Sequence, residues 1–179
     1  SSRATVRGMV RAQNRAGWDA EAWNYRGCSG EVNRRPQFYH SGATDDLDVV
    51  VRHVLAQPGY ATAALVGFSL GGNLVLKYAG ERGETVDPRL RRVVAFSAPC
   101  DLAAGAAHLA RPSNALYMRR FMRSFHHKIR TKAALFPDVV DAAGFERIRT
   151  FEEYDGRYTA PLHGFRDAHD YWHRCSSRR

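Results

Sequence analysis

The stretch that decides the fold is ATAALVGFSLGGNLVLKY, residues 61–78. Its first part, Ala61–Val66, is a short apolar run typical of a strand buried on both faces of a parallel sheet. Asn73–Ala79 carries apolar residues at helical spacing. Between them, Gly67-Phe68-Ser69-Leu70-Gly71 fits the pattern G-x-S-x-G. The sequence therefore predicts a strand, a very tight turn with a serine at its apex, and a helix.

The glycines of this turn serve a steric purpose, because a serine in a strained strand-to-helix turn needs neighbours without Cβ atoms two positions away. Such a turn lifts the Ser69 hydroxyl clear of the sheet. The Leu70 N–H, at the start of the helix, can then point at a developing oxyanion. The alternative is a glycine-rich β–α turn without chemistry, since the bare pattern arises by chance in roughly one chain in twenty of this length. The strand–turn–helix context favours Ser69 as a nucleophile and Leu70 as an oxyanion donor.

The composition is that of an ordinary folded domain. The chain has 179 residues, 44% of them hydrophobic and 25% charged, which suits one domain with a fair core. We find no secretory signal, and no apolar stretch near the roughly 20 residues that a transmembrane helix needs. The cysteines form an odd, widely spaced set without a C-x-x-C pair, namely Cys28, Cys100 and Cys175. These features predict reduced thiols and a cytoplasmic location.

The charge is strongly basic, with a formal net charge of +9. Such a balance raises nucleic acid and anionic membranes as partners. The arginines are scattered through every segment, however, and no alternation of aromatic and basic residues resembles an RNA-binding strand. We therefore expect no nucleic acid as a partner, and we keep an anionic membrane surface, bound peripherally, as a candidate. The sequence leaves the oligomeric state open.

The predicted elements alternate between helix and strand, which is typical of a parallel α/β sheet. We expect a helix over Arg3–Ala16, a strand over Trp18–Tyr25, a helix from Thr44 to about Gln57, and a strand over Arg92–Ser97. Thr44 is the expected cap of its helix, and acidic residues occupy the first turns. Ligands gather at the carboxyl ends of the strands in such sheets, where the loops 26–30 and 97–101 would meet Ser69.

The chain changes character after Asp101. From Leu102 to Pro137 it contains no acidic residue, while apolar residues recur at helical spacing among many basic ones. The pattern predicts an amphipathic basic helix over about 113–136, in an insertion after a sheet strand. We expect this insertion to form a cap over the Ser69 site or a membrane-facing surface. The alternative is a solvated helix that packs Phe121 and Phe125 on the sheet domain.

The catalytic partners of Ser69 are not evident in the sequence. A serine hydroxyl is a weak nucleophile until a histidine takes its proton and a carboxylate holds that histidine. The later histidines all lie in helical or loop sequence: His108, His126, His127, His163, His169 and His173. A structural role suits each of them better, and a base at His163, or at His40 against the usual chain order, is a weaker alternative. Cys28 is interpreted as a packing residue rather than a second nucleophile.

Several separated motifs resemble one protein family. They are Tyr25-Arg26-Gly27-Cys28-Ser29-Gly30-Glu31, Asn33-Arg34, Tyr39-His40-Ser41-Gly42 with Thr44 and Asp46, Gly67-Phe68-Ser69-Leu70-Gly71-Gly72-Asn73, Tyr158-Thr159, His163-Gly164-Phe165, Asp167-Ala168 and Asp170-Tyr171-Trp172. On these motifs the chain resembles the YheT-like branch of the α/β-hydrolases, related to the eukaryotic ABHD-type and plant EMB8-type proteins. The resemblance implies a partial α/β-hydrolase fold, with a parallel sheet, flanking helices and a helical cap insertion.

The resemblance also implies an activity and a division of the chain. Family members are hydrolases of carboxylesterase type, and some relatives act on acyl lipids. By resemblance Ser69 is the nucleophile and Leu70 a backbone oxyanion donor, with neither a metal nor an organic cofactor. Residues 1–100 are then the central part of the core, 101–163 the cap, and 164–179 a helix that returns to the core. The family's second oxyanion loop would lie before the first residue and its triad Asp and His beyond the last, so we expect a fragment lacking both ends.

Three functions are in competition at this point. The leading hypothesis is a serine hydrolase that acts on small-molecule acyl esters, lipid esters among them, through an acyl-enzyme at Ser69. The alternatives are a catalytically inactive hydrolase fold that serves as a binding module, and a basic peripheral membrane protein that uses the 113–136 helix. Outside the serine turn, Arg26, Glu31 and Arg34 are expected to form a buried ion-pair network. Neither the acyl chain length nor the physiological substrate follows from the sequence.

Overall fold

A computed structural model describes residues 4–178 of the chain, which divide into two compact units, residues 4–39 and residues 40–178. The first unit contains the helix α1 (Ala4–Arg15), as predicted, and an irregular segment. Within that segment the Tyr25 ring lies 4.8 Å from the Trp23 ring and 5.0 Å from the Tyr39 ring. Burial among these rings raises the pKa of the Tyr25 hydroxyl, which therefore stays protonated.

Two predictions for the first unit are wrong. Residues 18–25 form no strand, because a strand requires ladder hydrogen bonds to a neighbour and none pair this segment within described residues 4–39. The buried ion-pair network of Arg26, Glu31 and Arg34 is also wrong, because Glu31 and Arg34 are exposed to solvent. An ion pair between exposed side chains adds little stability, so the predicted network depended on the burial of these residues.

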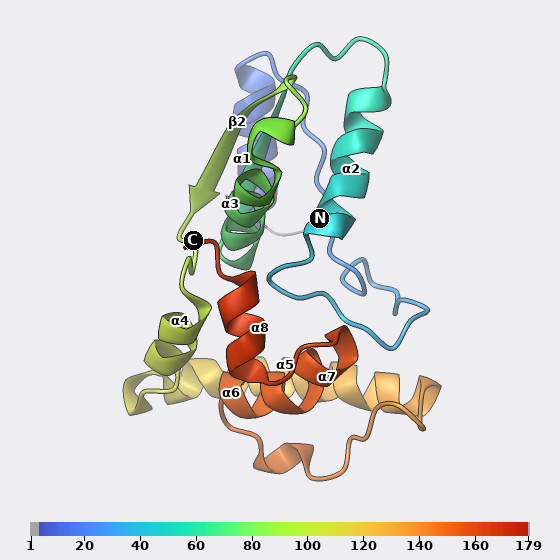
Figure 1. Cartoon of the computed structure of the whole chain (residues 1–179), viewed down its shortest axis with the longest axis vertical. Helices are drawn as coiled ribbons and strands as arrows, with labels where there is room; N and C mark the ends of the chain where they lie inside the picture. Colours follow the sequence, from blue (N-terminus) through green and yellow to red (C-terminus); the bar gives the residue numbers. More distant parts are fainter. Residues whose placement is uncertain (1–3, 179) are drawn as a thin grey trace. The chain divides into compact units, whose positions relative to one another are not determined.

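The second unit is built on a parallel pair of strands joined by a helix. Strand β1 (Ala63–Phe68) is followed by α3 (Leu70–Arg82), the short 3₁₀ helix η1 (Gly83–Thr85) and strand β2 (Leu90–Phe96). The strands pair in parallel from Ala63 opposite Leu90 to Phe68 opposite Phe96. Helix α2 (Thr44–Ala56) packs on α3, and α3 packs on both strands (Figure 1). The alternation of parallel strands and helices confirms the predicted α/β class.

The strands are less buried than the sequence predicts. Of β1 only Gly67 is fully buried, and on β2 Val94 and Phe96 are 41% and 42% exposed. Side chains alternate between the two faces of a strand, and Ala95 points at α3, so Val94 and Phe96 point away from it. The prediction of a strand covered on both faces is therefore wrong for β1 in the described structure, because α3 covers only one face of the pair.

Helices α2 and α3 are held together by a buried carboxylate. Asp48 accepts a hydrogen bond of 2.9 Å from the Tyr78 hydroxyl and forms ion pairs with Arg52 and Arg82. Burial alone would raise the pKa of Asp48, but the bonds from Tyr78 and Arg52 outweigh it and hold that pKa below its usual range. The predicted cap of α2 is wrong. Ala43 occupies the cap position without a side-chain bond, and Thr44 is the first helical residue.

The remaining elements of the second unit are helical. They are α4 (Leu102–Leu109), the 3₁₀ helix η2 (Pro112–Asn114), α5 (Ala115–Leu135), the 3₁₀ helix η3 (Phe145–Arg147), α6 (Phe151–Tyr154), the π-helix η4 (Asp155–Thr159), α7 (Ala160–His163) and α8 (Ala168–Cys175). Helix α8 packs on α4 and on η4, and the long α5 extends past α6 and α7 (Figure 1). The division of the chain into core, cap and return helix stays a prediction. Among the described helices, none is both long enough and apolar enough to cross a bilayer.

Helix α5 confirms the predicted basic helix and shows where its aromatic face packs. The Phe125 ring stacks on the Tyr154 ring at 4.3 Å, and the Phe121 ring lies 5.5 Å from the Phe151 ring. On the same side His126 stacks on Phe145 at 4.8 Å. These ring partners belong to α6 and η3, so the aromatic face of α5 joins the helical part of the unit.

We predict that Gly67→Ala abolishes the fold of the β1–α3 turn, while Gly80→Ala does not. A Cβ atom on Gly67 would overlap the backbone carbonyl of Gly71, which cannot move without unwinding the start of α3. Gly80 is the control, because it lies in α3, the helix that follows the turn, and a Cβ there meets nothing within 4 Å. Gly80→Ala should stabilise the protein by about 0.5–1 kcal/mol. Urea unfolding of both variants checks this, and a Gly67→Ala protein as stable as the parent would contradict it.

Candidate functional site

Ser69 occupies the strained turn between β1 and α3 that the sequence predicts. Its backbone has φ 52° and ψ −121°, a conformation that residues with a Cβ rarely adopt, and its side chain is exposed. The Ser69 N–H donates to the Phe96 carbonyl at 2.8 Å, and its own carbonyl accepts from the Gly72 N–H at 2.8 Å. The turn is thus bonded to β2 on one side and to α3 on the other.

The close approach of strand and helix at this turn requires glycine. A Cβ atom on Gly67 would collide with Gly71, and one on Gly72 would come within 2.8 Å of the Ala98 Cβ. The steric argument made from the sequence is therefore confirmed for the glycine two residues before Ser69. The close approach of Ala98, in the loop after β2, also disfavours a side chain at position 72.

The backbone N–H of Leu70 is free to act on a ligand. Leu70 is the first residue of α3, so no carbonyl lies four residues earlier in the helix to accept its hydrogen bond. The partial positive charge of a helix N-terminus adds to the dipole of that N–H. The Ser69 hydroxyl and the Leu70 N–H therefore lie on adjacent residues at the carboxyl end of β1, where parallel sheets bind ligands.

A second strained serine lies at the neighbouring strand end, and the sequence analysis did not predict it. Ser97 follows β2 directly and has φ 50°, and its side chain is exposed. Besides Ser69 it is the only residue other than glycine with a positive φ in the described part of the chain. Serine gives no sequence signal for this conformation. The position just beyond a strand and before Ala98-Pro99 is the sole hint.

The Ser69 hydroxyl makes no hydrogen bond to a histidine among the described residues. Across residues 4–178, no side chain forms a hydrogen bond with its hydroxyl. The two histidines held open as alternatives pack against each other instead, with the His40 and His163 rings 4.4 Å apart. The described residues also contain no cluster of three or more His, Cys, Asp or Glu side chains that could hold a metal ion.

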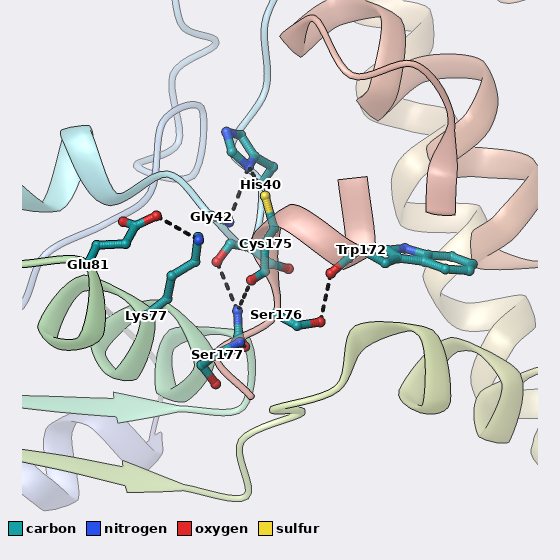
Figure 2. A network of polar contacts seen from close by, with 10 residues as sticks. His40, Gly42, Lys77, Glu81, Trp172, Cys175, Ser176 and Ser177 are labelled. Atoms are coloured by element: carbon teal, nitrogen blue, oxygen red, sulfur yellow. Dashed lines mark hydrogen bonds and ion pairs between the residues drawn. The ribbon is translucent and has the colours of Figure 1, made fainter. Parts of the chain in front are cut away.

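The buried side chain of Asn73 holds three segments together just behind the serine turn. Its amide donates to the carbonyls of Ser41 at 3.1 Å and Cys175 at 2.9 Å, and its oxygen accepts from the Ser177 N–H at 2.9 Å. Asn73 is completely buried. The chain after α8 is tied down further, because the Ser176 hydroxyl donates to the Trp172 carbonyl at 2.7 Å (Figure 2). In the sequence, Asn73 stands out only as the last residue of the motif Gly67–Asn73.

His40 lies over Cys175 in the same network (Figure 2). Its Nδ1 accepts from the Gly42 N–H at 3.2 Å and lies 3.8 Å from the Cys175 sulfur. Burial, followed by the neighbouring His163, lowers the pKa of His40 to about 4. A neutral imidazole can accept the Gly42 bond at Nδ1, and the contact with Cys175 holds the 40–42 loop against α8, which is a structural role.

A buried carboxylate forms a second polar centre in the helical part of the unit. The Asp155 oxygens accept hydrogen bonds from the Thr159 hydroxyl at 2.6 Å and from Trp172 Nε1 at 2.9 Å. Burial raises the pKa of Asp155 to about 6 in spite of these two bonds. Asp155 opens the π-helix η4, and this turn brings it to α8. No sequence motif predicted this contact.

Comparison with known proteins identifies the fold family. Residues 2–160 match the model of the alpha/beta hydrolase fold. The chain is 34% identical over 172 residues to the Escherichia coli protein named "Putative esterase YheT", a match that covers 95% of this chain and 50% of that protein. It is 28% identical over 172 residues to mouse "Phospholipase ABHD3", covering 96% of this chain and 41% of the relative.

A third relative, the Saccharomyces cerevisiae "Monoacylglycerol lipase", is 25% identical over 169 residues, covering 89% of this chain and 37% of the yeast protein. The chain thus spans half or less of the length of these curated relatives. No solved structure matches it. The resemblance seen in the motifs is confirmed, and so is the α/β-hydrolase fold class.

We predict that Asn73→Ala destabilises the second unit by about 3 kcal/mol or more, because it leaves two buried carbonyls and one partly buried N–H without the Asn73 side chain as partner. The matched control is Asn114→Ala. The Asn114 amide also donates to a carbonyl, that of His108, but at the surface, where water can replace it. Chemical unfolding should show a change within about 0.5 kcal/mol for the control. Equal losses in the two variants would contradict the role given to Asn73.

We predict opposite pH dependences of stability for His40→Asn and Asp155→Asn. Between about pH 4 and 6.5 the unfolded chain protonates His40 while the folded chain does not, so this group makes stability fall as pH falls. Between about pH 4 and 6 the folded chain keeps the Asp155 proton and the unfolded chain loses it, so this group makes stability fall as pH rises. Each effect amounts to about 3 kcal/mol and opposes the other.

Each substitution should therefore reveal the other group. Asp155→Asn should unfold more easily as pH falls from about 6.5 to 4, and His40→Asn more easily as pH rises from about 4 to 6. Asparagine at position 40 supplies an oxygen acceptor near the place of Nδ1, so the Gly42 bond has a substitute. Free energies of unfolding from urea titrations, compared with the parent protein at each pH, check this. Identical pH profiles in both variants would show that neither group titrates as described.

Proposed function

Because the chain belongs to the α/β-hydrolase family, we propose that it carries the nucleophilic serine of a carboxylic ester hydrolase. One observation carries the proposal: Ser69 is exposed at the carboxyl end of β1 with a strained backbone. Strain of this kind costs about 1–3 kcal/mol and persists at sites where it has a use. In a catalytic serine the strained backbone would serve to lift the hydroxyl clear of the sheet, where it can reach a substrate.

In the proposed reaction the Ser69 Oγ attacks the ester carbonyl carbon, and a general base removes the hydroxyl proton. The Leu70 N–H donates to the carbonyl oxygen as it becomes negatively charged, with the α3 dipole in support. The tetrahedral intermediate expels the alcohol, which takes a proton from the base, and leaves an acyl-enzyme. Water then repeats the two steps, releases the carboxylic acid and regenerates the serine hydroxyl.

The substrate class proposed is a small-molecule acyl ester, with lipid esters included. The relatives bear the names of an esterase, a phospholipase and a monoacylglycerol lipase, and all three names describe cleavage of acyl esters or phospholipids. The same motif and fold support transfer of the reaction class to this chain. The proposal includes a cytoplasmic location, supported by three widely spaced cysteines that form no disulfide within residues 4–178.

A second candidate function is a hydrolase fold that binds without catalysis. It is favoured by one observation, the lack of any side chain bonded to the Ser69 hydroxyl among residues 4–178. An unactivated serine reacts slowly, so such a protein would bind acyl compounds without turning them over. The two functions differ in a property that can be measured directly, the reactivity of Ser69.

We predict that Ser69→Ala lowers hydrolysis of p-nitrophenyl acetate by the full-length gene product by about 10⁴-fold or more. Labelling by a fluorophosphonate probe should disappear in the same variant, because the probe modifies activated serines. The matched control is Ser97→Ala, since Ser97 is also exposed and also has a positive φ at a neighbouring strand end. The control should keep its labelling.

The outcomes separate the candidates. Loss of labelling in Ser69→Ala alone supports the hydrolase. A full-length protein that is folded, is not labelled and binds acyl ester analogues supports the binding module. Labelling that survives Ser69→Ala and disappears in Ser97→Ala would move the nucleophile to the neighbouring strand end and overturn the assignment of Ser69.

A further inference from the structure

Helix α5 presents one continuous basic surface to solvent. We call it the basic face and define it by Leu116, Arg119, Arg120, Arg123, His127 and Arg130, all of which are exposed. At 3.6 residues per turn these six positions fall within an arc of about 100°. The buried residues of α5, among them Met118, Met122 and Ile129, lie on the opposite side. The helix is therefore held in place by one side and offers the other to a partner.

The charges of the basic face are not neutralised by the protein. Among residues 4–178, none of Arg119, Arg120, Arg123 and Arg130 forms an ion pair with a carboxylate. No acidic residue occurs between Leu102 and Pro137. In the segment that follows, Asp141 pairs with Arg157 at 3.0 Å. Four neighbouring guanidinium groups without carboxylate partners repel one another. An anionic partner would relieve this repulsion and be attracted by all four charges.

Apolar side chains are exposed at both ends of the helix. In its first turn Leu116 is 84% exposed and Tyr117 is 55% exposed. At the other end, Leu135 in the last turn and Val139 just beyond the helix are each 56% exposed. A single exposed apolar residue is ordinary. Apolar side chains beside basic ones can enter the interface of a membrane whose anionic headgroups attract the basic residues.

We propose that the basic face of α5 is a docking surface for anionic phospholipid membranes. The arginines contact lipid phosphates, and Leu116 and Tyr117 enter the interface beside them. A membrane fits the observations better than a nucleic acid, because exposed leucine and valine gain from leaving water in a bilayer and gain nothing against a phosphodiester backbone. The proposal goes beyond the chemistry of Ser69 and does not depend on it.

The binding test uses sedimentation with lipid vesicles of phosphatidylcholine, with or without phosphatidylglycerol. The protein should partition into the anionic vesicles, and binding should weaken as salt is raised, because exposed charges are screened. Substitution of Arg119, Arg120 and Arg123 by glutamine should lower the partition coefficient by about a hundredfold, since each arginine near the surface contributes about fivefold. The thermal transition of this triple variant should match that of the parent, since all three side chains are exposed.

The matched control replaces Arg7, Arg11 and Arg15 of α1 by glutamine. These three arginines are also exposed on a helix, and their loss removes the same three positive charges. If the location of the charge matters rather than its amount, this control binds as the parent does. A second pair tests the apolar part: Leu116→Ser should weaken vesicle binding severalfold, and Val49→Ser, at a residue that is 68% exposed on α2, should not.

Several outcomes would overturn the proposal. Equal losses in the α5 and α1 triple variants would show that only net charge counts. Binding to phosphatidylcholine as strong as to the anionic vesicles would remove the role of the arginines. Binding of an oligonucleotide through the α5 arginines, with no binding to vesicles, would make the partner a nucleic acid. Because none of these measurements requires Ser69, a failure here leaves the proposed hydrolase unaffected.

Discussion

The second unit depends on the hydrogen bonds of Asn73. The backbone N–H of Asn73 donates to the Ser69 carbonyl at 3.2 Å and so closes the strained turn. The amide group of its side chain binds the chain at residues 41, 175 and 177. Asparagine suits this position because it offers two donors and one acceptor on a short side chain. One buried residue thus couples the serine turn to segments more than a hundred positions apart in the sequence.

The strain at Ser69 persists because its surroundings leave no alternative. The turn is bonded to β2 through Phe96, and Gly67 and Gly72 allow helix and strand to approach to distances that a Cβ would forbid. Relaxing φ at Ser69 would break these bonds and pull α3 from the sheet. The arrangement fixes the hydroxyl and the Leu70 N–H on rigid elements, which is the condition for electrostatic stabilisation of a transition state.

Burial decides the charge state of the two titratable side chains that contact α8, His40 and Asp155. His40 stays neutral down to about pH 4, and Asp155 keeps its proton up to about pH 6. Between these two values neither side chain carries a charge in its buried position. Their effects on stability oppose each other between about pH 4 and 6. Both groups bond to residues of α8, which explains how a short helix of eight residues organises the 40–42 loop and η4.

The local sequence was enough to determine the strand, turn and helix around Ser69, the helices α1 and α2, and the basic helix α5. Each depends on steric rules or apolar spacing within a dozen or so residues. Tertiary structure decided the rest. The segment 18–25 has strand-like composition but no paired neighbour among described residues 4–39, and Glu31 and Arg34 are charged residues that stayed in water. The partners of Asn73 lie 32 or more positions away in the chain, and Trp172 bonds to Asp155 across 17 positions. Sequence spacing constrains such contacts only weakly, because packing selects them once the elements have formed.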